Sequence, residues 1–484
     1  MNTKPETEAH TTKPSRLALI IGPAMLVLSL LLPAPAGMSQ EAWLALGAAL
    51  WMATWWATEA VPIPATALLP LILVPVLGIG EAADLADAYA NAIIFLFLGG
   101  FLLGLAMQRW ELHRRIALNI LLAVGQQPSR QIAGFMIATA FLSMWVSNTA
   151  TSIMMLPIGL SVISFLPEGN GNERRRFAVA LLLAIAYSAS IGGIATLIGT
   201  PPNAMLAAYL KDNHNISIGF GQWMMIGLPV AVSMLLFTWW WLCRQGFAGL
   251  ETAGSRELLH AELQNLGPLN GAEKRVLLIF VTTAAAWIFR PLINVYLPGV
   301  SDTVIAMSAG LLLFTMRSGG PDSQVLLDWQ TAERLPWGVL LLFGGGLALA
   351  TMIKSSGLAA WLANNFSLLS AWPLFAVVVI IVSVIIFLTE ITSNTATTAT
   401  FLPLLGALAV AQSVSPMLFV IPAAIAASCA FMMPVATPPN AVVFGSGELG
   451  IKDMIHAGLL LNIFGIVLVS GLGYYLVVSL FIAA

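Results

Sequence analysis

Long apolar runs, each near the length of a membrane span, recur from one end of the chain to the other. An α-helix needs about 20 such residues to cross a bilayer. The runs are continuous and do not alternate with polar residues, so they predict helices and argue against a transmembrane β-barrel. The expected membrane segments are 17–33, 42–58, 62–79, 90–108, 177–210, 223–243, 274–297, 302–316, 337–354, 416–445 and 454–482.

Two further apolar stretches, 131–166 and 372–411, are each too long for one crossing. Each contains the same pentad near its middle, Ser-Asn-Thr-Ala-Thr, at 147–151 and at 393–397. Polar residues at mid-depth favour a break in the helix. We therefore expect two re-entrant helical hairpins, each with its pentad at the tip.

The pentads belong to a longer internal repeat. They lie 246 positions apart, and Pro157 and Pro403 hold the same offset. A second pentad, Thr-Pro-Pro-Asn-Ala, occurs at 200–204 and again at 437–441. A single Thr-Pro-Pro-Asn is most often a structural kink, but two copies that each follow a Ser-Asn-Thr indicate a repeated transporter architecture.

Charge placement predicts the topology. With the N-terminus in the cytoplasm and alternating spans, 17 of the 20 lysines and arginines face the cytoplasm, which agrees with the positive-inside rule. The first hairpin then enters from the cytoplasm and the second from outside, so the two repeats have inverted topology. Residues 1–36 also resemble a signal peptide, but the long polar tail favours a retained first helix.

Composition agrees with this class. Hydrophobic residues make up 59% of the chain and charged residues 9%, a balance typical of a polytopic membrane protein. Two cysteines, one in each half, do not support a disulfide framework. A net charge of −2 without a basic aromatic patch gives no indication of nucleic acid as a partner. The five histidines form no metal-spaced set.

The motifs carry groups that suit ions of both signs. Helix N-termini at the hairpin tips present free N–H groups and a positive dipole end, which favour carboxylates. Consecutive prolines remove backbone donors from a helix and free the carbonyls near Gly199 and Ala436. Such carbonyls, with side-chain oxygens, suit a hard cation such as Na⁺. Neither motif contains Lys or Arg, which favours sodium coupling.

The paired Ser-Asn-Thr and Thr-Pro-Pro-Asn motifs, together with Trp56-Ala57-Thr58-Glu59-Ala60-Val61-Pro62, resemble the divalent anion:sodium symporter family. The resemblance covers nearly the whole chain from about residue 40. It implies transport of dicarboxylates, tricarboxylates or sulfate, with Na⁺ as the co-transported ion and no organic cofactor. It also implies a homodimer in the lipid bilayer and an elevator mechanism with a scaffold and a moving transport domain.

Transferred motif by motif, the resemblance assigns two sets of residues. The implied substrate-binding residues are Ser147, Asn148, Thr149, Thr200, Pro201, Ser393, Asn394, Thr395, Thr437 and Pro438. The implied first sodium site comprises Ser143, Ser147, Asn148 and the Gly199 carbonyl. The implied second comprises Thr389, Asn394 and the Ala436 carbonyl, with Thr392 nearby.

The expected organisation follows the same division. Scaffold helices occupy 1–108 and, together with a linker, 246–356. The transport domain occupies 129–245, which contains hairpin 130–166, and 372–484, which contains hairpin 372–411. Two surface arm helices, a cytoplasmic one at 109–128 and an outer one at 357–371, connect the scaffold to the transport domain.

Several other residues admit two interpretations. Glu59 falls at a predicted cytoplasmic turn and is interpreted as interfacial structure. Glu390 follows Thr389 directly, so it either shapes the second ion site or relays a proton, or it satisfies a structural partner. Asn91, Gly99-Gly100 and Gly344–Gly346 are interpreted as close helix packing.

The sequence thus predicts a sodium-coupled symporter of C4-dicarboxylates such as succinate, malate and fumarate in a bacterial inner membrane. A sodium-independent dicarboxylate exchanger and a sulfate or tricarboxylate carrier are the alternatives on the same fold. An intramembrane enzyme is not favoured, because the spans lack a catalytic Ser–Lys or Asp pair. A channel would differ in counterflow, because it cannot accumulate substrate.

Overall fold

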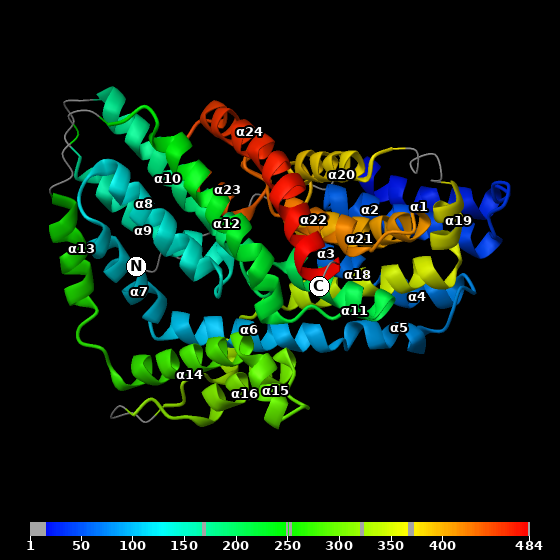
Figure 1. Cartoon of the computed structure of the whole chain (residues 1–484), viewed down its shortest axis with the longest axis horizontal. Helices are drawn as coiled ribbons and strands as arrows, with labels where there is room; N and C mark the ends of the chain where they lie inside the picture. Colours follow the sequence, from blue (N-terminus) through cyan, green and yellow to red (C-terminus); the bar gives the residue numbers. More distant parts are fainter. Residues whose placement is uncertain are drawn as a thin grey trace, which may run out of the picture.

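The computed structural model describes residues 16–166, 171–247, 250, 254–319, 324–365 and 372–482, which fold into helices joined by short turns (Figure 1). The helices of the first half are α1 (Arg16–Leu31), α2 (Gln40–Thr58), α3 (Ile63–Thr66), α4 (Leu69–Val76), α5 (Ala82–Tyr89), α6 (Ala92–Arg109), α7 (Leu112–Val124), α8 (Pro128–Ser143), α9 (Asn148–Ser164), α10 (Gly171–Ile194), α11 (Pro201–His214) and α12 (Phe220–Cys243).

The second half is described in the same way. Its helices are α13 (Gly254–Asn265), α14 (Gly271–Ile288), α15 (Arg290–Tyr296), α16 (Asp302–Thr315), α17 (Trp329–Ala332), α18 (Trp337–Ser355), α19 (Leu358–Asn365), α20 (Leu374–Thr389), α21 (Asn394–Ala411), α22 (Met417–Ala427), α23 (Pro438–Phe444), α24 (Ile451–Leu468) and α25 (Tyr474–Val477). Two π-helical turns, Val469–Gly473 and Val478–Ile482, flank α25.

Many of these helices have the length and composition of membrane spans. Six described helices are long and apolar enough to cross a bilayer, or up to seven if the pair α14–α15 forms one bent span. Shorter apolar helices, including α9, α16, α20 and α22, accompany them. The predicted all-helical, polytopic membrane fold is therefore confirmed, while the count of about 11 spans stays a prediction.

Four of the predicted membrane segments are not single helices, and in two of them, 177–210 and 416–445, the proline pairs had already predicted a break. The segment 62–79 forms two short helices, α3 and α4, and 274–297 bends by 79° between α14 and α15. The segments 177–210 and 416–445 are each interrupted, between α10 and α11 and between α22 and α23. The cause in each case is proline, which removes a backbone donor and ends or begins a helix where a hydropathy profile sees only continuity.

Helices from distant parts of the sequence pack closely. α6 runs along α16, and a Cβ atom added at Gly99 would lie 2.6 Å from the backbone of Ala306. A Cβ at Gly345, on α18, would lie 2.4 Å from the Ala67 carbonyl oxygen. The interpretation of these glycines as close-packing positions is confirmed, since no other residue permits such approach.

Two polar residues have structural roles at helix ends. Asn91 is not a packing residue as expected: its side chain accepts from the backbone N–H of Ile93, at the start of α6, and donates to Asp212 at 2.6 Å. Glu59 is exposed and ends α2 with a φ of 47°, which agrees with interfacial structure. A short polar side chain at a helix start satisfies a free backbone donor.

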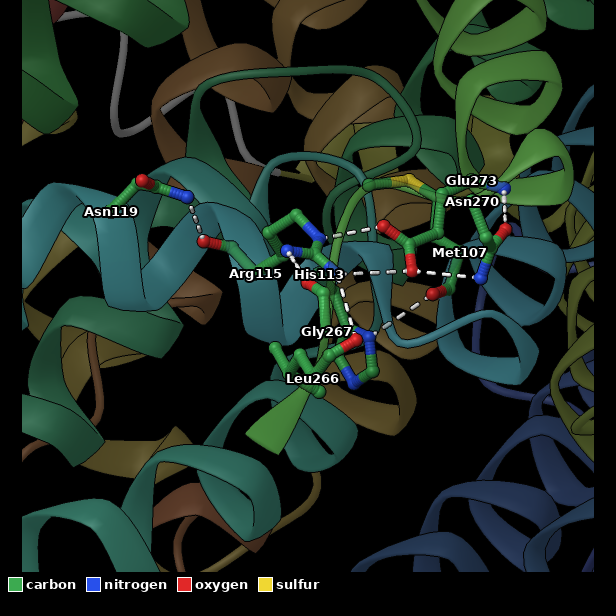
Figure 2. Close-up of polar contacts among 8 residues, drawn as sticks. All are labelled: Met107, His113, Arg115, Asn119, Leu266, Gly267, Asn270 and Glu273. Carbon is green, nitrogen blue, oxygen red and sulfur yellow. Dashed lines mark hydrogen bonds and ion pairs between the residues drawn. The ribbon is translucent and has the colours of Figure 1, made fainter. Parts of the chain in front are cut away.

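The predicted cytoplasmic surface helix is α7, and Arg115 fastens it to the start of α14 (Figure 2). The guanidinium donates to both oxygens of Glu273, at 2.6 and 3.2 Å, and to the carbonyls of Leu266 and Gly267 at 3.1 and 3.0 Å. Asn270 donates to the same carboxyl group at 3.0 Å. Both charged side chains are largely buried, so the ion pair between Arg115 and Glu273 holds α7 against the start of α14.

Two further contacts hold the same helix. His113 Nδ1 lies 3.1 Å from the Met107 carbonyl oxygen, which can only accept, so Nδ1 carries the proton. Burial lowers the pKa of His113, although this hydrogen bond opposes the shift, and the imidazole is favoured in its neutral form. Arg114 pairs with Glu262 of α13. The arm is thus anchored to the linker and to α14.

We expect Glu273→Gln to lower the free energy of unfolding by about 2–3 kcal/mol, because it leaves the buried Arg115 charge without its partner. Thermal unfolding of the purified protein in detergent measures the change. Glu262→Gln is the matched control, because its partner Arg114 is more exposed, and its cost should stay below about 1 kcal/mol. Equal losses in both variants would show that Glu273 has no special role.

Candidate functional site

Each Ser-Asn-Thr motif begins a helix, as predicted for the hairpin tips. α8 ends at Ser143, and α9 starts at Asn148, with the Ser147 hydroxyl accepting from the Ala150 N–H at 3.3 Å. In the second copy α20 ends at Thr389 and α21 starts at Asn394. Two new helix N-termini are thereby placed within the two apolar stretches, where a positive dipole end attracts anions.

The oxygen atoms of the first motif cluster around Asn148. Its Oδ1 lies 2.5 Å from Ser143 Oγ and 3.2 Å from the carbonyl oxygens of both Gly199 and Ala189. Ser143 Oγ in turn lies 2.7 Å from the Ala189 carbonyl. Three of the four predicted first-site residues are therefore brought together, and the fourth, Ser147, is next to Asn148 in the chain.

This cluster has more acceptors than donors. The Ser143 hydroxyl supplies one proton, while the Asn148 amide oxygen and the carbonyl oxygens of Gly199 and Ala189 all face the cluster as acceptors. Two arrangements satisfy them: the Asn148 amide turns by 180° and donates its N–H groups, or a cation lies among the oxygens. Because hard cations prefer such oxygen ligands, the residues fit a sodium ion.

The second motif repeats the arrangement. Thr389 Oγ1 lies 2.8 Å from Asn394 Oδ1 and 3.0 Å from the Ala427 carbonyl oxygen. The Thr392 hydroxyl has other partners: it donates to the Leu388 carbonyl at 2.8 Å and lies 2.7 Å from Thr397 Oγ1. In the part of the chain that the structure describes, the hydrogen bonds of this cluster do not include the Ala436 carbonyl.

Each Thr-Pro-Pro-Asn motif starts a new helix directly after a break in the backbone. The prolines occupy the first two positions of α11 and α23, where their missing N–H groups are not needed. Thr200 and Thr437 are the buried residues that precede them, whereas Pro438 is exposed. Thr437 accepts from the Asn440 N–H at 3.3 Å.

The asparagine of each copy satisfies the broken backbone before it. Asn203 Nδ2 donates to the carbonyls of Gly193, Ile194 and Thr196, at 2.7–3.2 Å. Asn440 Nδ2 does the same for Ala430 and Met433, at 3.3 and 3.0 Å. An unpaired carbonyl in the bilayer costs several kcal/mol, so these amides allow the break to exist.

Glu390 supports the break in the second half alone. Its carboxyl oxygens accept from the backbone N–H groups of Phe431, Met432 and Met433, at 2.7–3.1 Å, and from Asn462 Nδ2 at 2.7 Å. The side chain is buried. Of the two interpretations left open by the sequence, this geometry favours the structural partner, and it holds the segment after α22 beside the second oxygen cluster.

Contacts between the halves surround the motifs. α9 of the first hairpin packs against α23, and α21 of the second hairpin packs against α11. Each helix that follows a Ser-Asn-Thr thus contacts the helix that follows the Thr-Pro-Pro-Asn of the other half. The six residues of the two Ser-Asn-Thr motifs are half-buried and therefore remain partly accessible: Ser147, Asn148, Thr149, Ser393, Asn394 and Thr395.

Sequence reasoning missed several groups of this site. The Ala189 and Ala427 carbonyls carry no side-chain signature, and only the tertiary fold brings them to Ser143 and Thr389. The roles of Asn203 and Asn440 could have been predicted from the sequence, because both residues belong to the repeated pentad. A buried amide that recurs beside two prolines is a signal for backbone carbonyls that need donors.

Broken helices that gather oxygen ligands inside an all-helical membrane protein define a secondary transporter. A family model described as the sodium:sulfate symporter transmembrane region matches residues 13–482. The chain belongs to this family, the divalent anion:sodium symporters, as its motifs indicated.

Curated relatives extend over nearly the same length. The sodium-dependent dicarboxylate transporter SdcS of Staphylococcus saprophyticus is 44% identical over 472 residues, which cover 95% of this chain and 91% of the relative. SdcS of Staphylococcus aureus is 42% identical over 470 residues, with coverage of 95% and 90%. Proteins of this similarity share the fold of the chain from end to end.

Two solved structures resemble the fold alone. The YdaH transporter of Alcanivorax borkumensis matches with a TM-score of 0.58 at 16% identity, covering 96% of this chain and 99% of its own. Neisseria gonorrhoeae MtrF matches with a TM-score of 0.57 at 11% identity, covering 97% and 95%.

We expect Glu390→Gln to destabilise the protein by about 1–3 kcal/mol, because the amide nitrogen would replace an acceptor and leave a buried N–H unpaired. Glu448→Gln, at an exposed position, is the control and should change nothing measurable. Thermal unfolding in detergent, with and without sodium, measures the melting temperature of both variants. An unchanged Glu390→Gln melting temperature would contradict the structural assignment.

Proposed function

We propose that the protein is a sodium-coupled secondary active transporter, a symporter of C4-dicarboxylates such as succinate, malate and fumarate. The observation that carries the proposal is the paired oxygen cluster, Ser143–Asn148 in one half and Thr389–Asn394 in the other. The two relatives described above, both named sodium-dependent dicarboxylate transporters, support the same ion and the same class of substrate.

In this proposal each oxygen cluster binds one sodium ion as a transported substrate. The first ion is held by Ser143, Ser147, Asn148 and the Gly199 carbonyl, to which the geometry adds the Ala189 carbonyl. The second is held by Thr389, Asn394 and the Ala436 carbonyl, with Thr392 nearby and the Ala427 carbonyl added. In the first cluster, sodium would relieve the excess of acceptors.

The dicarboxylate is proposed to bind between the two hairpin tips. The residues assigned to it are Ser147, Asn148, Thr149, Thr200, Pro201, Ser393, Asn394, Thr395, Thr437 and Pro438. The N-termini of α9 and α21 supply N–H donors and positive dipole ends to the carboxylate oxygens. Two sodium charges offset the dianion, so the loaded site avoids carrying a net charge through an apolar barrier.

We further propose an elevator mechanism with two inverted repeats. The scaffold comprises 1–108 and 246–356, and the transport domain comprises 129–245 and 372–484. α7 (within 109–128) and α19 (within 357–371) would act as arms, and the ion pair between Arg115 and Glu273 supports an arm fixed to the scaffold. The proposal includes a homodimer in a bacterial inner membrane, with the N-terminus in the cytoplasm.

Labelled succinate uptake into proteoliposomes tests the coupling. An inward sodium gradient should drive accumulation, and replacing sodium by potassium should abolish it, because the oxygen clusters would lose their cation. Uptake without sodium that depends on internal dicarboxylate would instead identify an exchanger. The family description names sulfate, so competition by sulfate tests a sulfate carrier in the same experiment.

Substituting Thr for Asn148 or Asn394 should lower sodium-driven uptake about tenfold or more. Each amide oxygen is a proposed ion ligand, and the shorter Thr side chain cannot place its hydroxyl oxygen at the same position. Asn119→Thr is the matched control: Asn119 is exposed on α7 and should transport normally. Size-exclusion profiles verify folding. Normal uptake by both site variants would refute the assignment.

A further inference from the structure

A groove of about 430 Å³ lies between the end of α12 and the beginning of α24, far in sequence from both hairpin tips. The two helices pack against each other over this region (Figure 1). Trp241 forms one wall, and a single face of α24 forms the other, with Lys452, His456 and Leu459 among its residues. None of these residues belongs to the proposed transport site.

The cytoplasmic end of the groove is cationic. Lys452 and His456, one helical turn apart, are both exposed, and the His456 ring faces Trp241 with centroids 6.3 Å apart. The exposed Arg244 lies over Trp241, which forms the other wall, with its guanidinium carbon 3.6 Å from the centroid of the Trp241 ring. The neighbouring acid, Asp453, is already paired with Arg175. Lys452 and Arg244 therefore place positive charge at this end, and the His456 imidazole adds a polar ring beside them.

The rest of the groove is apolar and continues along α24. Leu459, Leu460 and Ile463 follow His456 at helical spacing, so they lie below it on the same face. Leu459 and Ile463 are 40% and 46% exposed, and Val467 beyond them is 66% exposed. The wall thus changes from cationic to apolar along its length.

This groove lies on a lipid-facing part of the fold. α12 and the stretch from α24 onward are candidate membrane spans, yet only 33% and 28% of their most apolar windows are buried, against 94% for α10. Tryptophans at 239–241 mark the interfacial level of the bilayer, where amphipathic rings concentrate. The cations therefore lie at headgroup depth and the apolar wall at acyl-chain depth.

We propose that this groove is a binding site for a membrane phospholipid with an anionic headgroup. The phosphate contacts Lys452 and His456, Trp241 covers the glycerol region, and an acyl chain lies along Leu459 and Ile463. A free dicarboxylate would match only the cationic end and leave the apolar wall uncovered. Basic residues at this depth attract anionic lipids and extend toward headgroups.

Native mass spectrometry of the purified full chain tests the proposal, with phosphatidylglycerol and phosphatidylcholine of identical acyl chains as probes. We expect phosphatidylglycerol to bind more tightly, because the choline cation of phosphatidylcholine offsets its phosphate charge. The double variant Lys452→Gln, His456→Gln should weaken phosphatidylglycerol about five- to tenfold and phosphatidylcholine clearly less. The double variant Lys274→Gln, His260→Gln is the matched control, because it removes the same residue types from exposed positions elsewhere.

A second variant addresses the apolar wall. Leu459→Asn should weaken both lipids, because it places an amide against the acyl chain. Three results would overturn the proposal: equal binding of the two lipids by the wild type, equal loss of phosphatidylglycerol in the groove and control variants, or displacement of the lipid by succinate. Because lipid binding is measured without transport, its failure is distinguishable from failure of the proposed transport function.

Discussion

The structure depends on a requirement for hydrogen-bond partners wherever a helix is broken inside an apolar environment. Four breaks occur, at the two hairpin tips and before the two proline pairs. Water cannot satisfy the freed backbone groups at that depth, so the protein supplies partners itself. Asn203 and Asn440 donate to the freed carbonyls, and Glu390 accepts from the freed N–H groups.

The same requirement connects stability to function. Beside these breaks, Ser143 and Asn148 in one half, and Thr389 and Asn394 in the other, meet backbone carbonyls and form oxygen clusters that suit a cation. The proposed sodium sites are thus positions where the fold gathers carbonyl and side-chain oxygens next to its broken helices.

The halves solve this problem in related but unequal ways. Both use a hydroxyl before the hairpin tip and an asparagine after the proline pair, yet only the second half adds a buried carboxyl group, Glu390. Met144 stands at the corresponding position of the first half. The two oxygen clusters therefore share a hydroxyl, an asparagine and a backbone carbonyl but differ in their surroundings.

The sequence alone determined the membrane class, the repeated motifs and the helix breaks at both hairpins, because hydropathy and local polar residues are encoded within short windows. The grouping of Ser143 with Asn148, and of Thr389 with Asn394, was implied by the family resemblance of motifs that lie close together in the chain. The tertiary structure alone decided which carbonyls meet them, since Ala189 lies 46 residues from Ser143, and it alone paired Arg115 with Glu273, 158 residues away. A backbone carbonyl has no residue type to read, and partners so distant in the chain are selected only when the helices pack.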